Sequence, residues 1–184
     1  MKRNDQDALG ASGGLGPGPR RLRVLFVCLG NICRSPAAEI VCRAALEREG
    51  LTGAVEVDSC GTASYHVGQK PDARMLAALE RAGYSYGGHR ARVFRRDDFR
   101  EFDVIVPQDE SNREDLLALA RTEEERQRVR LMSSWFADGE HEHEVPDPYY
   151  GGAAGFDAVI ALLERSMPAL IQELRERLAG RISF

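Results

Sequence analysis

A cysteine and an arginine six positions apart form the most chemically distinctive spacing in the chain. They are Cys28 and Arg34, in the run CLGNICRSP at residues 28–36. The five residues between them are enough for the backbone to curl around one tetrahedral oxyanion, with the N–H groups of residues 29–34 pointing inward. The Arg34 guanidinium can hold two oxygens of that anion in a fork. A Cys28 thiolate beneath a bound phosphoryl group is a nucleophile in position.

The other residues of this loop have types that suit an anion-binding ring. Gly30 and Asn31 tolerate a positive φ, which a ring of inward N–H groups requires. Ser35 can donate a hydrogen bond to the thiolate and ease its later departure. The alternative is a buried structural cysteine close to an unrelated arginine. We expect the ring to contact substrate through Leu29, Gly30, Asn31, Ile32, Cys33 and Ser35.

The elements on either side of the loop fit the same geometry. Residues 24–27 are an apolar run of the kind that a buried parallel strand shows. Residues 36–48 follow with a helical apolar stripe, and Pro36 lies in the first turn, where proline is favoured. A loop between a strand and a helix directs backbone N–H groups at a helix N-terminus, which stabilises both an anion and a thiolate.

A second stretch, DPYYGG at residues 147–152, carries a carboxylate. Asp147 lies between two prolines, which favour an extended backbone. A carboxylate in such a loop is a plausible acid, which would protonate a leaving oxygen and later take a proton from the attacking water. Tyr149 and Tyr150 can form a wall of the cleft. The alternative for this stretch is an ordinary turn whose tyrosines pack on their own loop.

Together, CLGNICRSP and DPYYGG resemble the phosphate loop and the acid loop of the low-molecular-weight protein tyrosine phosphatase family. The resemblance extends from about Leu22 to the final helix. It implies an α/β, flavodoxin-like three-layer fold with a four-stranded parallel sheet and helices on both faces, with no metal and no cofactor. It implies hydrolysis of phosphotyrosine through a cysteinyl-phosphate intermediate. The implied partner is a phosphotyrosine-containing protein, with a tyrosine kinase as one such partner.

The resemblance also assigns residues outside the two motifs. Tyr65 follows a strand, at the edge where doubly wound sheets bind ligands, and corresponds to a substrate-lining aromatic that is often Trp. An aromatic packed under its own loop is the alternative. The resemblance suggests that His89 braces the phosphate loop through Asn31. Asp109, with Ser111 beside it, is expected to support the loop from a neighbouring strand end.

One departure from the family pattern lies directly before Asp109. The family usually has Ala-Met there, whereas this chain has Pro107-Gln108. Because proline lacks the N–H that a strand ladder needs, we expect the strand at residues 102–107 to end at Pro107. Further expected elements are strands at residues 54–58 and 131–132, and helices at residues 73–81, capped by Asp72, at 113–120 and at 154–178, with a kink or break at Pro168.

Length and charge indicate how many domains the chain has and which kinds of partner it is not expected to bind. The 184 residues suit one domain, which we place at residues 21–184 after a Gly- and Pro-rich leader, residues 1–20, expected to be disordered. The formal net charge of −4 argues against broad affinity for nucleic acid. No apolar run approaches the roughly 20 residues that span a bilayer, so no membrane association is expected.

The cysteines point to a reducing compartment. Their spacing, at Cys28, Cys33, Cys42 and Cys60, matches neither a zinc site nor a disulfide framework, and free thiols favour the cytoplasm. Cys33 could form a reversible disulfide with Cys28 that protects the nucleophile, or could simply pack behind the loop. A run of alternating acidic residues and histidines at 140–144 could bind a metal, but a solvated loop explains it more simply.

Two other activities share the cysteine loop and remain alternatives. Thioredoxin-coupled arsenate reductases also need two resolving cysteines well downstream, and no cysteine follows Cys60. A protein-arginine phosphatase has a loop that resembles CTGNTCRSP, with Thr where this chain has Ile32. The bulky Ile32 favours an aryl phosphate over a polar phosphoguanidine. A phosphopeptide-binding module without activity is disfavoured, because nucleophile, arginine and acid are all present.

Overall fold

The computed structural model describes residues 20–180 of the chain. The predicted leader, residues 1–20, lies outside the described residues except for Arg20. Within residues 20–180, no helix combines the length and the apolar character that crossing a membrane requires.

Three parallel strands form the central sheet. They are β1 (Leu22–Cys28), β2 (Val55–Gly61) and β3 (Val104–Pro107), in the order β2-β1-β3. Cys28 pairs with Gly61 at the ends of the first two strands. Because parallel strands end at a common edge, the segments that follow them meet there. This edge carries the cysteine loop.

Strand β1 is buried on both faces, which explains its continuous apolar sequence. Val24 and Phe26 belong to one hydrophobic cluster, whereas Leu25 and Val27 belong to another on the opposite face. Alternate side chains of a strand point to opposite faces, so β1 joins both cores of the molecule.

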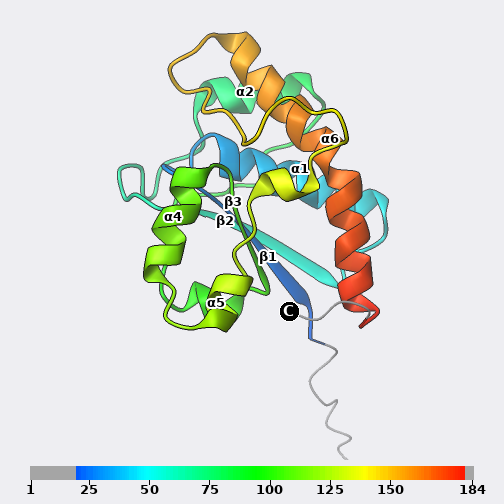
Figure 1. The fold of residues 1–184 in the computed structure, drawn as a ribbon. Coiled ribbons are helices and arrows are strands. Elements are labelled where there is room, and N and C mark those ends of the chain that lie inside the picture. Colours follow the sequence, from blue (N-terminus) through cyan, green and yellow to red (C-terminus); the bar gives the residue numbers. More distant parts are fainter. Residues whose placement is uncertain (1–19, 181–184) are drawn as a thin grey trace, which may run out of the picture.

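Helices cover the two faces of the sheet (Figure 1). The larger cluster includes residues of α1 (Arg34–Arg48), α2 (Ala73–Arg81), the 3₁₀ turn η1 (Met132–Trp135) and α6 (Ala153–Leu178). The smaller cluster includes residues of α3 (Asp98–Glu101) and α4 (Glu110–Leu119), and the short α5 (Glu123–Gln127) follows on that side. The α/β architecture with a parallel sheet and helices on both faces is therefore as predicted.

Several local predictions hold. Helix α2 spans Ala73–Arg81, and the Asp72 side chain caps it by accepting a hydrogen bond from the backbone N–H of Arg74. Strand β3 ends at Pro107, as expected for a residue that cannot donate to the ladder. The Gln108 N–H instead donates to the carbonyl of Val27 at 2.9 Å, which keeps the chain against β1 for one more residue.

The predicted fourth strand at Leu131-Met132 is wrong, since the sheet of the described residues has three strands. A single parallel bridge, between Ile105 and Val129, is formed where that strand would pair. The chain then turns into the 3₁₀ helix η1, with the N–H of Ser134 donating to the carbonyl of Leu131 at 2.9 Å. Serine favours such local turns, so the short apolar run does not extend the sheet.

Pro168 does not break the last helix. Helix α6 runs without interruption from Ala153 to Leu178, so a break into two helices at Pro168 is wrong, and the alternative, a kink, stays a prediction. Pro168 lies on the exposed side, while Met167 and Leu170 next to it are buried against the main core. Packing of the apolar face therefore maintains the helix through the proline, as tertiary contacts commonly override helix propensity.

We predict that Phe26→Ala destabilises the domain severely. The Phe26 side chain is fully buried at the centre of β1, and replacing a buried Phe with Ala costs about 3–5 kcal/mol. Urea unfolding would measure the loss. Leu119→Ala, at a half-exposed side chain on α4, is the control and should change stability by less than about 0.5 kcal/mol. A similar loss in both variants would contradict the role of β1 as the shared core strand.

Candidate active site

A cavity of about 210 Å³ lies at the carboxyl edge of the sheet, where the cysteine loop meets the segment that precedes α6. It brings together most of the residues that the sequence singled out. The lining residues are Cys28, Leu29, Gly30, Ile32, Cys33, Arg34, Tyr65, His66, Asp147, Tyr149 and Tyr150.

The Cys28 sulfur lies at the floor of this cavity and is held by the loop that follows it. The backbone N–H of Asn31 donates to the sulfur at 3.3 Å, and the Ser35 hydroxyl lies 3.0 Å from it. Ser35 also donates to the carbonyl of Cys60 at 3.1 Å. Because a serine hydroxyl has one proton, it can donate a hydrogen bond to the sulfur or to that carbonyl, but not to both at once.

The Asn31 side chain is the main brace of the loop. Asn31 adopts a positive φ of 56°, whereas Gly30 does not, so only one of the two predicted positions uses this region. The amide nitrogen donates to the hydroxyls of Ser35 at 2.9 Å and Ser59 at 3.0 Å. Its oxygen accepts from the Arg92 backbone N–H at 3.0 Å and faces His89 Nε2 at 2.9 Å. All four hydrogen-bonding positions of the amide are therefore used.

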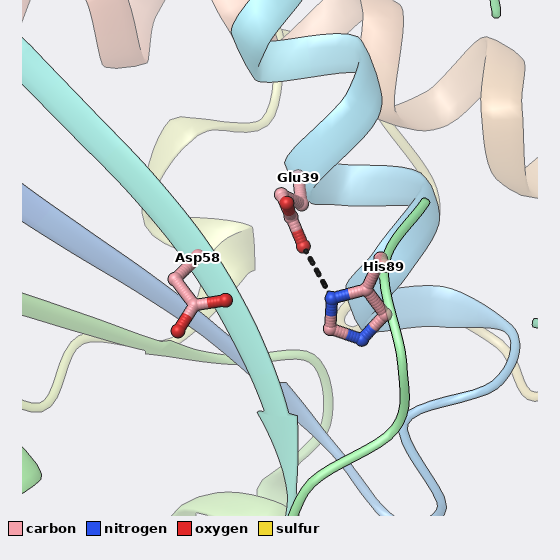
Figure 2. A group of neighbouring side chains, drawn as sticks. All are labelled: Glu39, Asp58 and His89. Carbon is pink, nitrogen blue, oxygen red and sulfur yellow. Dashed lines mark ion pairs between the residues drawn. The ribbon is translucent and has the colours of Figure 1, made fainter. Parts of the chain in front are cut away.

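This pattern places a proton on Nε2 of His89. The Arg92 N–H can only donate, so Asn31 must present its oxygen on this side, and His89 Nε2 must carry a proton. His89 therefore braces the loop from outside, at the position that the resemblance suggested. Burial lowers the pKa of His89. Its Nδ1 faces Glu39 Oε2 at 3.3 Å (Figure 2).

The carboxylates near His89 have partners already. Glu39, Asp58 and His89 are the group of the described residues whose donor atoms lie close enough for a metal, within 4.8 Å of one another (Figure 2). Glu39, however, accepts from Arg43 at 2.5 Å and from the Ser59 hydroxyl at 2.7 Å. Arg92 donates to Asp58 at 2.9 Å. A cation would have to displace guanidinium groups, so this cluster serves as a brace for Asn31 rather than as a metal site.

Arg34 is a buried cation held by carboxylates. Its Nη1 donates to Asp109 at 2.5 Å and to the carbonyl of Val145 at 3.2 Å, and its Nη2 lies 3.4 Å from Asp147. Burial lowers the pKa of Arg34, but the nearby Cys28 and Asp109 raise it, and the net direction is upward. Asp109 thus orients the guanidinium toward the cavity, and also caps α4 by accepting from the Asn112 N–H.

Aromatic side chains line the mouth of the cavity. Tyr65 is largely exposed, and Tyr149 and Tyr150 pack edge to face with ring centres 5.0 Å apart. His66 lies directly over Gly30, and a Cβ at Gly30 would come within 2.9 Å of its ring. Glycine at this position therefore permits the close approach of the His66 ring, which would have to shift to accommodate a larger residue, and does not serve a positive φ.

Two predicted residues behave differently from their neighbours. Ser111 is exposed on α4 and is not among the residues that line the cavity, so its expected support of the site stays a prediction without a contact to carry it. Cys33 lines the cavity as a free cysteine. Burial, followed by the Asp72 carboxylate, raises the pKa of Cys33 to about 12. Its disulfide with Cys28 stays a prediction.

Other residues of the site were not found from the sequence. His66 lines the cavity, and Ser59 and Glu39 complete the brace around Asn31. Arg74 donates to the carbonyl of Tyr149 at 2.9 Å. None of them belongs to a motif, and each acts through a partner distant in sequence. The one available signal was the position of Ser59 and Gly61 at a strand end next to the loop.

Comparisons with known proteins agree on one family. The family model described as low molecular weight phosphotyrosine protein phosphatase matches residues 23–179. A low molecular weight protein-tyrosine-phosphatase of Streptomyces coelicolor is 43% identical over 162 residues, covering 86% of this chain and 97% of that protein. The low molecular weight phosphotyrosine protein phosphatase of Sus scrofa is 36% identical over 153 residues, covering 83% and 95%.

A solved structure shows the same fold. The protein tyrosine phosphatase of Entamoeba histolytica, crystallised with Hepes in its active site, matches with a TM-score of 0.81 and 41% identity. The match covers 85% of this chain and 99% of that one.

We predict that Asn31→Gly destabilises the domain and weakens anion binding. Glycine keeps the positive φ but removes four side-chain hydrogen bonds, which should cost at least about 2 kcal/mol. Asn31→Ala should lose about 1 kcal/mol more, because alanine pays to enter the left-handed region. Urea unfolding and calorimetric titration with inorganic phosphate measure both effects. Wild-type stability in the glycine variant would contradict the bracing role of the amide.

Proposed function

Since this chain belongs to the low molecular weight phosphotyrosine protein phosphatase family, we propose that Cys28 is its nucleophile, Arg34 its phosphate-binding cation and Asp147 its general acid and base. The enzyme is a protein-tyrosine phosphatase that acts through a cysteinyl-phosphate intermediate. The observation that carries the assignment is that these three side chains, from distant parts of the sequence, line one cavity.

In the first step the Cys28 sulfur attacks phosphorus in line with the leaving oxygen. The S–P bond forms, the P–O bond to the tyrosine breaks, and Asp147 gives its proton to that oxygen. The Arg34 guanidinium and the loop N–H groups neutralise the charge on the equatorial oxygens, which is the main electrostatic contribution. Asp109 supports this by fixing the direction of Arg34, at 2.5 Å from its Nη1.

In the second step water releases phosphate. Asp147 takes a proton from the water, the new P–O bond forms, and the S–P bond breaks to return the thiolate. The Ser35 hydroxyl can change its hydrogen-bond acceptor during this cycle. It donates to the sulfur while the thiolate is present and to the Cys60 carbonyl while the sulfur is bound to phosphorus.

The cavity favours an aryl phosphate as substrate. Tyr65, Tyr149 and Tyr150 offer aromatic surface at its mouth, while Ile32 is apolar where a phosphoguanidine would need polar partners. We therefore propose phosphotyrosine proteins as substrates, with tyrosine kinases that carry phosphotyrosine among them. The four cysteines, all unpaired, support a reducing cellular compartment such as the cytoplasm.

We predict that Cys28→Ser abolishes turnover and that Asp147→Asn lowers kcat by about 100-fold or more. The first variant removes the nucleophile, and the second removes proton transfer, which contributes roughly 10²–10⁴-fold. Steady-state hydrolysis of an aryl phosphate measures both. The inhibition constant of inorganic phosphate should stay within about threefold in Asp147→Asn. Asp138→Asn, at another exposed carboxylate, is the matched control. Near-normal kcat in Asp147→Asn would refute its assigned role.

We also predict a clear order among phosphopeptides. The kcat/KM for a phosphotyrosine peptide should exceed that for the matched phosphoserine and phosphoarginine peptides by about 100-fold, equal to roughly 2.7 kcal/mol of transition-state binding. The reason is that only the phenyl ring both reaches Cys28 and fills the aromatic mouth. Cys28→Ser sets the background. Faster hydrolysis of the phosphoarginine peptide would favour the arginine phosphatase alternative instead.

A further inference from the structure

Arg74 joins two parts of the site that are distant in sequence. It is the second residue of α2, and its Nε and Nη2 donate to the two carboxylate oxygens of Asp72 at 3.0 and 2.8 Å. Its Nη1 donates to the backbone carbonyl of Tyr149 at 2.9 Å. The two bonds to Asp72 fix the orientation of the planar guanidinium, and its remaining nitrogen then holds the backbone of Tyr149.

The Asp72 end is anchored to the phosphate loop. The backbone N–H of Asp72 donates to the carbonyl of Ile32 at 2.8 Å. The Asp72 side chain also accepts from the Arg74 backbone N–H at 2.8 Å, which caps α2. The hydrogen bond from the Arg74 side chain is the largest cause that lowers the pKa of Asp72, so the carboxylate stays ionised near neutral pH. Arg74 is therefore attached to the phosphate loop through Asp72.

The Tyr149 end is anchored to Asp147. The backbone N–H of Tyr149 donates to Asp147 Oδ1 at 3.1 Å, so the position of this residue directs the carboxylate. The Arg74 guanidinium also lies 5.2 Å from the centre of the Tyr149 ring and 4.8 Å from that of Phe156, which is fully buried in α6. The tyrosine is thus held by a hydrogen bond and by stacking on a cation that rests on the core.

Asp147 needs such an external support. Asp147, Tyr149 and Tyr150 are all exposed, and an exposed segment has little packing of its own to fix a side chain. The other contact of the carboxylate is with Arg34 Nη2 at 3.4 Å, which a bound phosphoryl group would compete for. During turnover, the bond from the Tyr149 N–H is then the one that remains to orient the acid.

We propose that Arg74 is a positioning residue for proton transfer, which fixes Tyr149, and through it Asp147, at the height of the leaving oxygen. This inference rests on the proposed role of Asp147. Arg74 exchanges no proton and contacts no reacting atom. Its contribution appears when Asp147 delivers a proton to the leaving oxygen as the P–O bond breaks, and again when it accepts one from water.

The test compares leaving groups. A series of aryl phosphates whose phenols span a range of acidity is hydrolysed by the wild type, Arg74→Gln and Arg74→Lys. Basic phenolates depend most on protonation, so the loss of kcat/KM in Arg74→Gln should grow from about threefold for the most acidic phenol to about 30-fold for the most basic. Arg74→Lys should be intermediate, because it keeps a donor for the Tyr149 carbonyl but loses the fork on Asp72.

Arg81 supplies the matched control. It also lies on α2 and also joins that helix to another element, through an ion pair with Asp157 of α6 at 2.7 Å. Both partners are half-exposed and neither lines the cavity. Arg81→Gln should therefore leave the dependence on the leaving group as it is in the wild type. Thermal unfolding of each variant shows whether the fold is retained.

Two outcomes would overturn the inference. The first is a general loss in Arg74→Gln, seen either as an equal fall in kcat/KM for all leaving groups or as a rise of the same size in the inhibition constant of inorganic phosphate. Either result would mean a general structural role. The second concerns the double variant. If Arg74 acts through Asp147, then Arg74→Gln should change the activity of Asp147→Asn by less than about twofold. A full further loss contradicts this. Normal kcat in Asp147→Asn alone would instead refute the proposed function.

Discussion

The side-chain amide of Asn31 connects the cysteine loop to three neighbouring parts of the fold. It bonds Ser35 at the start of α1, Ser59 on β2, and both His89 and the Arg92 backbone on the segment after α2. An amide offers two donors and two acceptor positions, and all are used here, so any shift of the loop breaks a buried bond. A left-handed residue at this point is stable because its side chain is so firmly held.

Close packing on the other side of the loop completes this constraint. A Cβ at Gly61 would lie 2.6 Å from the carbonyl of Leu29 and 3.1 Å from the nitrogen of Asn31, so only glycine lets the loop rest on the end of β2. The N–H of Thr62 then donates to the Cys28 carbonyl at 2.8 Å. The position of the sulfur is thus set by the register of β1 with β2, which is itself fixed by two hydrophobic cores.

The parts of the site that could be predicted are those where the chemistry is contiguous. Cys28, Arg34 and Ser35 share one loop between a strand and a helix, so pattern and spacing suffice. Arg74 could not be predicted, because its partner Tyr149 is 75 residues away and neither residue type is diagnostic. The prediction of a fourth strand was wrong for a related reason. An apolar pair such as Leu131-Met132 fits a strand or a buried turn equally well, and only the tertiary contacts of Met132 decide between them.

The Cys28 sulfur and the Asp147 carboxylate are held in place by different kinds of interaction. The Cys28 sulfur is fixed by hydrogen bonds between buried groups, which salt screens little, whereas Asp147, the proposed acid, is exposed and depends on the half-exposed Arg74 and on a long contact with the buried Arg34. This division suits the reaction. Cys28, the proposed nucleophile, must stay aligned with phosphorus through both steps, while Asp147, the proposed acid, must exchange a proton with water between them and therefore has to stay exposed. An exposed carboxylate can still be well directed if the residue that donates to it is itself held, and Arg74, stacked on the buried Phe156, holds Tyr149, whose N–H donates to Asp147.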